Sequence, residues 1–269
     1  MIKRNFKAAL LAASAMLVAV SAQATVTVNQ LDLTTDATGT DTGTINGAIF
    51  TVTFQQPTGT GVIDPFLRVQ NQGTEQGYNT SGGTPFDDKA GIFTHDLLYS
   101  SLQHCAVTIN GTQYYQFLLD VNEPASAKLI TLDNLQIYTS ATGSQTTTNV
   151  SSLGTPVYSL DTVNAKGTGG TDNSVLIDAL RNHGSGSGDV LISVPVSNFA
   201  GTLSTDYVYL YALFGAADVM ASGGFEEFAV VCNVTPVPEL SSFFPIVGLM
   251  AAVFATTFLR KRRMAQISV

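Results

Sequence analysis

Residues 107–119 read Val-Thr-Ile-Asn-Gly-Thr-Gln-Tyr-Tyr-Gln-Phe-Leu-Leu, so that Asn110-Gly111 stands between two apolar runs. Asn-Gly is the preferred pair for a two-residue type I′ turn, because both central residues of that turn need a positive φ. The flanking runs are rich in β-branched and aromatic residues, which favour strands. This stretch therefore predicts a β-hairpin.

The same strand pattern recurs on both sides of this hairpin. Five further segments are apolar, β-branched or aromatic and are bounded by turn residues: 45–54, 128–138, 190–196, 207–214 and 225–232. No stretch has a clear 3.6-residue apolar period, and 174–182 is the one segment in which we expect a short helix. Many short strands with turn signals predict an all-β fold, a single jelly-roll-like β-sandwich over residues 25–235.

Charge is unevenly distributed along the 269 residues, of which only 12% are charged. Residues 25–235 hold five of the twelve Lys and Arg residues but nineteen of the twenty acids, which gives this part a net charge of −14. A nucleic-acid-binding protein needs a basic surface. The composition therefore excludes nucleic acid as a partner.

The first 24 residues have the three parts of a secretory signal peptide. Three basic residues lie at the start, an apolar run covers 8–20, and the small residues of Ala22-Gln23-Ala24 follow. The apolar run is shorter than the roughly 20 residues that a membrane-spanning helix needs. We expect export, with cleavage after Ala24.

The C-terminal end predicts a membrane anchor. Residues 243–259 carry no charge, and Arg260, Lys261, Arg262 and Arg263 follow at once. A helix of this length spans about 25 Å, close to the thickness of a thin bilayer core. Because basic residues favour the cytoplasmic side, we expect a transmembrane helix over 243–259, a cytoplasmic tail over 264–269, and residues 25–235 outside the inner membrane.

A short motif, Val237-Pro238-Glu239-Leu240, precedes this helix. The combination of motif, apolar helix and basic end over residues 236–263 resembles the PEP-CTERM sorting signal of exported proteins in Gram-negative bacteria, with Leu240 in place of the second proline. The resemblance implies that the secretion machinery and an exosortase act on the chain, and that an inner-membrane-anchored precursor passes to the cell surface or extracellular matrix. A plain stop-transfer anchor is the alternative.

Cys105 and Cys232 are the two cysteines of the chain. Disulfides persist in oxidising compartments, so these residues form a disulfide or remain two small buried apolar side chains. The sequence leaves both arrangements open because it does not give the separation of the two residues in space.

Acidic residues cluster near expected strand ends. Asp120, Asn122 and Glu123 form one cluster and Glu226-Glu227 another, with Asp87-Asp88 and Asp133-Asn134 elsewhere. These oxygens fit a solvated acidic surface, a calcium site or the carboxylate pair of a glycosidase. Calcium is the one cofactor that they suggest, with Asp120, Asn122, Glu123, Glu226 and Glu227 as ligands.

A catalytic constellation is missing from the sequence. The three histidines have no metal-ligand spacing, and Gly184-Ser-Gly-Ser-Gly lacks the central serine of a nucleophile elbow. Tyr207, Tyr209 and Tyr211 share one strand face, which suits cross-strand packing or sugar stacking. We expect a non-catalytic surface or matrix protein, associated with exopolysaccharide or biofilm; the alternative is a carbohydrate-binding module or weak glycoside hydrolase delivered to the cell surface.

Overall fold

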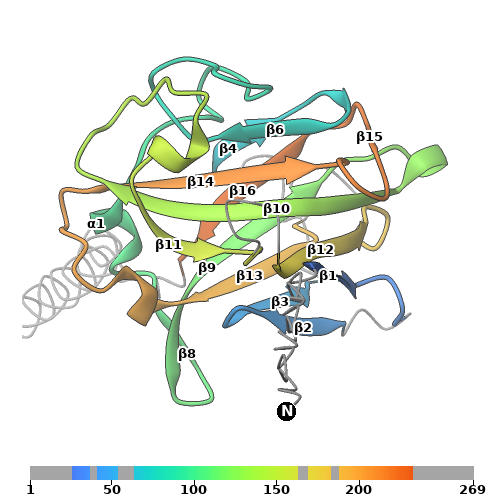
Figure 1. The fold of residues 1–269 in the computed structure, drawn as a ribbon, viewed down its shortest axis with the longest axis horizontal. Helices are drawn as coiled ribbons and strands as arrows, with labels where there is room; N and C mark the ends of the chain where they lie inside the picture. Colours follow the sequence, from blue (N-terminus) through green and yellow to red (C-terminus); the bar gives the residue numbers. More distant parts are fainter. Residues whose placement is uncertain (1–25, 37–40, 54–63, 163–168, 183–187, 233–269) are drawn as a thin grey trace, which may run out of the picture.

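The computed structural model describes residues 26–36, 41–53, 64–162, 169–182 and 188–232 (Figure 1). Outside the described residues lie the signal peptide with Ala22 and Ala24, the sorting motif Val237–Leu240, the expected helix 243–259 and the basic residues Arg260–Arg263. Among the described residues, no helix is long and apolar enough to cross a membrane.

The described chain is mostly strand, so the all-β prediction is confirmed. Its elements are β1 (Val26–Asp32), β2 (Thr42–Ile45), β3 (Ala48–Val52), β4 (Pro65–Val69), β5 (Gln72–Gly73), β6 (Glu75–Tyr78), β7 (Leu97–Leu98), α1 (Tyr99–Leu102), β8 (Val107–Ile109), β9 (Thr112–Val121), η1 (Ala125–Ala127), β10 (Leu129–Ser140), η2 (Val150–Ser152), β11 (Thr155–Ser159), β12 (Gly170–Asp178), β13 (Val190–Pro195), η3 (Val196–Phe199), β14 (Tyr207–Phe214), β15 (Ala221–Ser222) and β16 (Glu226–Val231).

Two seven-stranded sheets form the body of the described chain. Sheet A has the order β1-β12-β10-β14-β6, with β11 on β10 and β7 on β14. Sheet B has the order β2-β3-β13-β9-β16-β4, with β8 on β9. Most neighbours are antiparallel, but β1 runs parallel to β12 at the edge of sheet A. The short strands β5 and β15 pair separately.

One apolar core lies between the inner faces of the two sheets. Strand β14 shows the alternation that builds it, because Val208, Leu210, Ala212 and Phe214 are buried in this core. Sheet B supplies facing residues such as Phe50, Phe117, Ile192 and Phe228. Burial of apolar surface contributes about 25 cal/mol for each Å² removed from water, so this core is the main source of stability.

A second, smaller cluster covers the outer face of sheet A. Tyr78, Tyr209 and Tyr211 pack there, and the ring centroids of Tyr78 and Tyr209 lie 6.0 Å apart, edge to face. The Tyr209 hydroxyl donates to the carbonyl oxygen of Thr142 at 3.0 Å, which holds the loop after β10 over the cluster. Tyr209 is 0% and Tyr211 is 7% exposed, so these two tyrosines serve packing and offer no open platform for a sugar.

The structure corrects two details of the expected elements. The segment 45–54 is divided, because Asn46 and Gly47 adopt φ values of 49° and 86° and join β2 to β3. This is the same turn chemistry as at Asn110-Gly111. The expected helix at 174–182 is wrong, since 174–178 belong to β12, whose pairing with both β1 and β10 outweighs the weak local preference.

Candidate functional site

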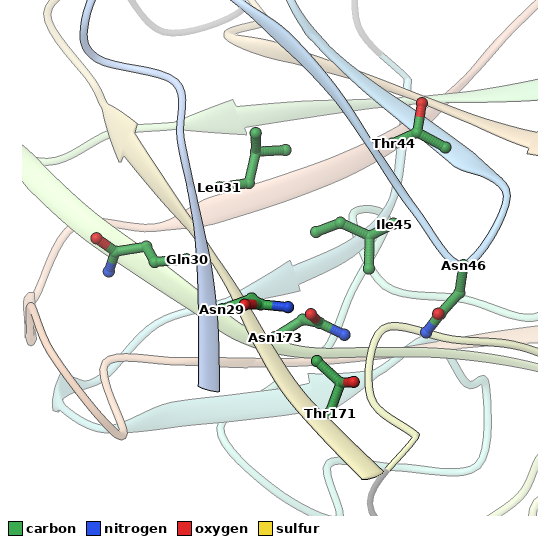
Figure 2. A pocket seen from close by; sticks show the side chains of 8 residues that line it. All are labelled: Asn29, Gln30, Leu31, Thr44, Ile45, Asn46, Thr171 and Asn173. Atoms are coloured by element: carbon green, nitrogen blue, oxygen red, sulfur yellow. The ribbon is translucent and has the colours of Figure 1, made fainter. Parts of the chain in front are cut away.

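A groove of 350 Å³ opens at the edge of the fold, where β1 and β12 of sheet A face the β2–β3 turn of sheet B (Figure 2). Cavities of about 300–1,000 Å³ are typical of small-molecule sites. The lining combines amides, hydroxyls and two aliphatic side chains, and none of its residues is charged: Asn29, Gln30, Leu31, Thr44, Ile45, Asn46, Thr171 and Asn173. We name this feature the edge groove.

Two asparagine side chains of the edge groove are held in fixed orientations. Asn173 Nδ2 donates to the carbonyl oxygen of Leu160 at 2.7 Å. Asn46 Nδ2 donates to the same oxygen at 2.8 Å and to the carbonyl oxygen of Ser159 at 3.0 Å. Because backbone carbonyls engage both amide nitrogens, the amide oxygens remain available to accept hydrogen bonds from a ligand.

Strand geometry explains why these side chains meet. In the parallel pairing of β1 and β12, Asn29 lies opposite Asn173, and alternate residues of a strand share one face. Asn29, Leu31, Thr171 and Asn173 therefore line the same side of sheet A. Figure 2 shows Asn29, Thr171 and Asn173 gathered on one side of the groove and Asn46 reaching toward them from the β2–β3 turn.

A glycine lets the two sheets approach closely beside the edge groove. A Cβ atom at Gly43 would lie 2.4 Å from Cδ1 of Leu31. Leu31 would have to move aside for a side chain at position 43, so its present packing against β2 depends on the glycine. Leu31 is one of the two aliphatic residues that line the groove.

The acidic residues near β16 point to opposite faces of sheet B. In the pairing with β9, Glu226 lies opposite Val121 and Glu227 lies opposite Asp120. Since successive side chains of a strand alternate, Glu226 turns toward the core and Glu227 turns away from it. Asp120, Glu226 and Glu227 are all buried, which overturns the interpretation of these residues as a solvated acidic surface.

Glu226 meets a second carboxyl between the sheets. Glu226 and Glu75 of β6 are both 0% exposed, and Oε2 of Glu75 accepts the backbone N–H of Asn71 at 2.7 Å. Burial, and then the neighbouring Glu75 carboxyl, raise the pKa of Glu226 well above its usual range. Burial between the sheets and the second carboxyl therefore favour the neutral form of Glu226.

Glu227 has a cationic partner on the outer face of sheet B. Nε of Arg68 donates to Oε1 of Glu227 at 2.6 Å. The guanidinium carbon lies 3.6 Å from the ring centroid of Phe93 and 4.5 Å from that of Phe225. Burial raises the pKa of Glu227, while the Arg68 contact acts in the opposite direction. This ion pair fixes β4 to β16.

The expected calcium ligands are not assembled into one site. The Glu123 carboxylate accepts the backbone N–H of Ser222 at 2.9 Å and also the Ser222 hydroxyl. Strand alternation divides Asp120, Glu226 and Glu227 between two faces. Across the described ranges, no group of three or more His, Cys, Asp or Glu side chains is arranged to hold a metal ion.

Burial also raises the pKa values of four further acids. Asp189 is 2% exposed, and its Oδ2 accepts the backbone N–H of Val121 at 2.7 Å. Burial raises the pKa of Asp189 to about 9 and that of Asp161 to about 6. Asp88 and Asp133 are also buried, and their pKa values are raised for the same reason.

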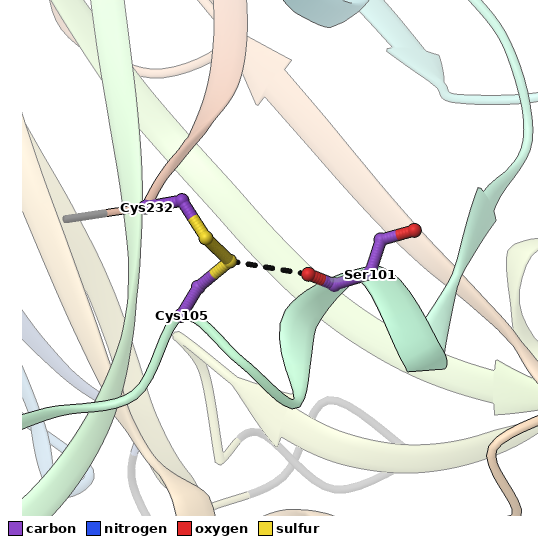
Figure 3. The surroundings of a disulfide bond; sticks show 3 residues. All are labelled: Ser101, Cys105 and Cys232. Carbon is purple, nitrogen blue, oxygen red and sulfur yellow. Dashed lines mark hydrogen bonds between the residues drawn. A yellow bond between two sulfur atoms is a disulfide. The ribbon is translucent and has the colours of Figure 1, made fainter. Parts of the chain in front are cut away.

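The structure joins Cys105 to Cys232 in a disulfide, with Cα atoms 4.4 Å apart (Figure 3). Sγ of Cys105 also lies 3.1 Å from the carbonyl oxygen of Ser101. A disulfide sulfur carries no hydrogen, so this is a close contact rather than a donated hydrogen bond. The bridge ties the chain after β16 to the segment between α1 and β8.

Several residues of these sites escaped the sequence analysis. Asn29, Asn173, Glu75 and Asp189 belong to no recognisable motif, and only the three-dimensional pairing of strands brings them together. The one available signal was Asn46-Gly47, a second Asn-Gly pair between apolar residues. Recognition of that turn would have placed Asn46 at a strand edge.

No family model, curated protein or solved structure matches this chain.

Proposed function

We propose that the chain is an exported, non-catalytic surface or extracellular-matrix protein, anchored by its tail until an exosortase removes that tail. The observation that carries the proposal is the Cys105–Cys232 disulfide. Structural disulfides belong mainly to oxidising compartments outside the cytoplasm. The bridge therefore agrees with the export that the N-terminal 24 residues predict.

The position of the bridge supports the same function. Cys232 directly follows β16 and lies four positions before Pro236, where the expected sorting segment begins. The bond fastens the chain directly after β16. An exosortase could therefore act on an extended Val237-Pro238-Glu239-Leu240 stretch without loosening β16, because the proline residues favour extended backbone.

We include a jelly-roll-like sandwich in this proposal. Its support is the strand order, since β4-β16-β9-β13 are neighbours in sheet B and β6-β14-β10-β12 are neighbours in sheet A. Paired four-stranded sheets of this kind build a double Greek key. Strands β1 to β3 extend the two sheets at one edge and, together with β12, form the edge groove there.

Carbohydrate binding is the second candidate function, and the edge groove favours it. Its lining is neutral and polar, in a chain that is otherwise strongly acidic. We do not propose glycoside hydrolysis by Asp120, Glu226 or Glu227, because these carboxyl groups are buried.

The test of export and sorting uses the full chain in a Gram-negative host that has an exosortase. Intact-mass analysis is expected to find a product that begins at Thr25, ends near Val237–Leu240 and contains no free thiol. Glu239→Ala should leave the tail attached, whereas the matched variant Ser241→Ala should be processed. A product that still contains residues 1–24, or that has two free thiols, would overturn the proposed export. A wild-type product that retains residues 241–269 would overturn the proposed sorting.

A further inference from the structure

We infer that the edge groove binds a short segment of a neutral polysaccharide, with Asn29, Asn46, Thr171 and Asn173 as its polar contacts. This inference rests on the proposed surface location, which would expose the groove to extracellular glycans. It names a ligand class and a position for the carbohydrate binding that remains the second candidate function.

The hydrogen-bonding inventory of the groove suits sugar hydroxyls. The amide oxygens of Asn46 and Asn173 are free to accept, because their nitrogens donate to the carbonyl oxygens of Ser159 and Leu160. Asn29 and Thr171 make no side-chain hydrogen bond within the described part of the chain, so they can both donate and accept. A hydroxyl group both donates and accepts, and it complements this mixture.

The apolar part of the groove suits the carbon face of a sugar ring. Leu31 and Ile45 lie beside the amides in Figure 2 and pack partly against the core. Ligand sites typically combine an apolar surface with a few fixed polar groups. The amides would set the orientation of the ring, while Leu31 and Ile45 would bury its C–H groups.

Charge determines which polysaccharide fits. The lining contains no Lys or Arg to pair with a uronate or phosphate, and the chain around it is acidic. An anionic polymer would be repelled at this site. The structure therefore favours neutral hexose or N-acetylhexosamine units.

A peptide is the competing occupant, because β1 is an edge strand whose backbone could pair with an added strand. Such binding would depend on backbone groups of β1 and would not need the side chains of Asn29 and Thr171. Amides on two different sheets that converge on one cavity favour a compact polyhydroxylated ligand instead.

The experiment is calorimetric titration of the full chain in a detergent without a sugar headgroup. The probes are cellohexaose, maltohexaose, N-acetylchitohexaose and an anionic alginate hexamer. At least one neutral probe should bind, and Asn29→Ala combined with Thr171→Val should weaken that binding at least tenfold. Val28→Ala is the matched control, since Val28 lies on the same strand, is 70% exposed and points to the other face.

Thermal melting of each variant shows whether the fold is intact, and the single variant Asn29→Ala replaces the double variant if the latter unfolds. Binding of the alginate hexamer alone, no binding of any neutral probe, or equal affinity of the groove variants and wild type would overturn the inference. Export and sorting are measured separately by mass, so failure of sugar binding leaves the proposed surface location standing.

Discussion

Burial raises the pKa of several carboxyl groups in this protein, and Asp189 is the clearest case. One oxygen of Asp189 accepts the Val121 N–H at 2.7 Å, and the residue is only 2% exposed. The pKa of Asp189 rises from 3.8 to about 9. Between those values the folded protein keeps a proton that the unfolded chain releases. Stability from this group is complete below pH 3.8 and is lost as the pH rises toward 9.

The melting temperature of the wild-type protein should therefore fall from pH 5 to pH 9. Asp161, with a pKa raised to about 6, adds to the early part of this decline. Asp189→Asn should raise the melting temperature at pH 8 by about 2–4 °C, the shift that about 1 kcal/mol gives a domain of this size. Differential scanning calorimetry across the pH range measures both effects.

Asp64→Asn serves as the control, because Asp64 is exposed. The melting temperature of this variant should fall with pH as that of the wild-type protein does. A flat pH profile for the wild-type protein would contradict the assignment of neutral buried acids.

Individual residues were the hardest scale to predict from sequence. The sequence pattern placed Asp120 and Glu227 near strand ends, and in the structure they lie opposite each other on the neighbouring strands β9 and β16. It did not show that they are buried, because burial depends on which sheet face the other strands cover. Glu75 illustrates this limit, since it meets Glu226 only through the packing of β6 against β16 from the opposite sheet.

Tight turns define the hairpins at the element scale. Gly111 has φ 83°, and a Cβ atom added there would meet no atom within 4 Å. Any loss of stability on substitution of Gly111 must therefore come from the backbone conformation rather than from a steric clash. The β8–β9 hairpin isolates this effect because it projects from the body of the fold in Figure 1.

Gly111→Ala should lower the free energy of unfolding by about 1–2 kcal/mol, the cost of left-handed backbone for a residue with a Cβ atom. Gly111→Asn should lower the free energy of unfolding by a smaller amount, since asparagine tolerates this conformation. Urea unfolding of the three proteins gives the comparison. Equal stability of the alanine variant and wild type would show that the turn does not hold this geometry in solution.

Elements with strong local chemistry were predicted well. The strand expected at 207–214 coincides with β14, and the Asn110-Gly111 hairpin is present. Strands with polar sequences were missed, including β1, β6 and β12. Strand β12 lies between β1 and β10, so its conformation is set by its neighbours more than by residues 174–178 themselves.

At the scale of the whole molecule, the disulfide joins residues 127 positions apart. In the chain-entropy model, closing a loop of this length stabilises the folded state by about 4–5 kcal/mol. Cys105→Ala combined with Cys232→Ala should lose about that amount, measured by urea unfolding. The single variant Cys232→Ala should lose a similar amount, because either change removes the bridge.

Reduction of the wild-type protein provides an independent check, since it removes the same bridge without a substitution. If the reduced protein and the double variant were as stable as the oxidised protein, the bridge would make no contribution to the fold.

The bridge also decides how the molecule would carry a mechanical load. A force that arrives along the chain at Cys232 passes directly to Cys105 through a covalent bond. The strands from β8 to β16 lie in the loop that the disulfide closes, so they do not bear this force. Without the disulfide, full extension of those 127 residues would lengthen the chain by roughly 450 Å. The part of the chain between the two cysteines would therefore not lengthen under such a load.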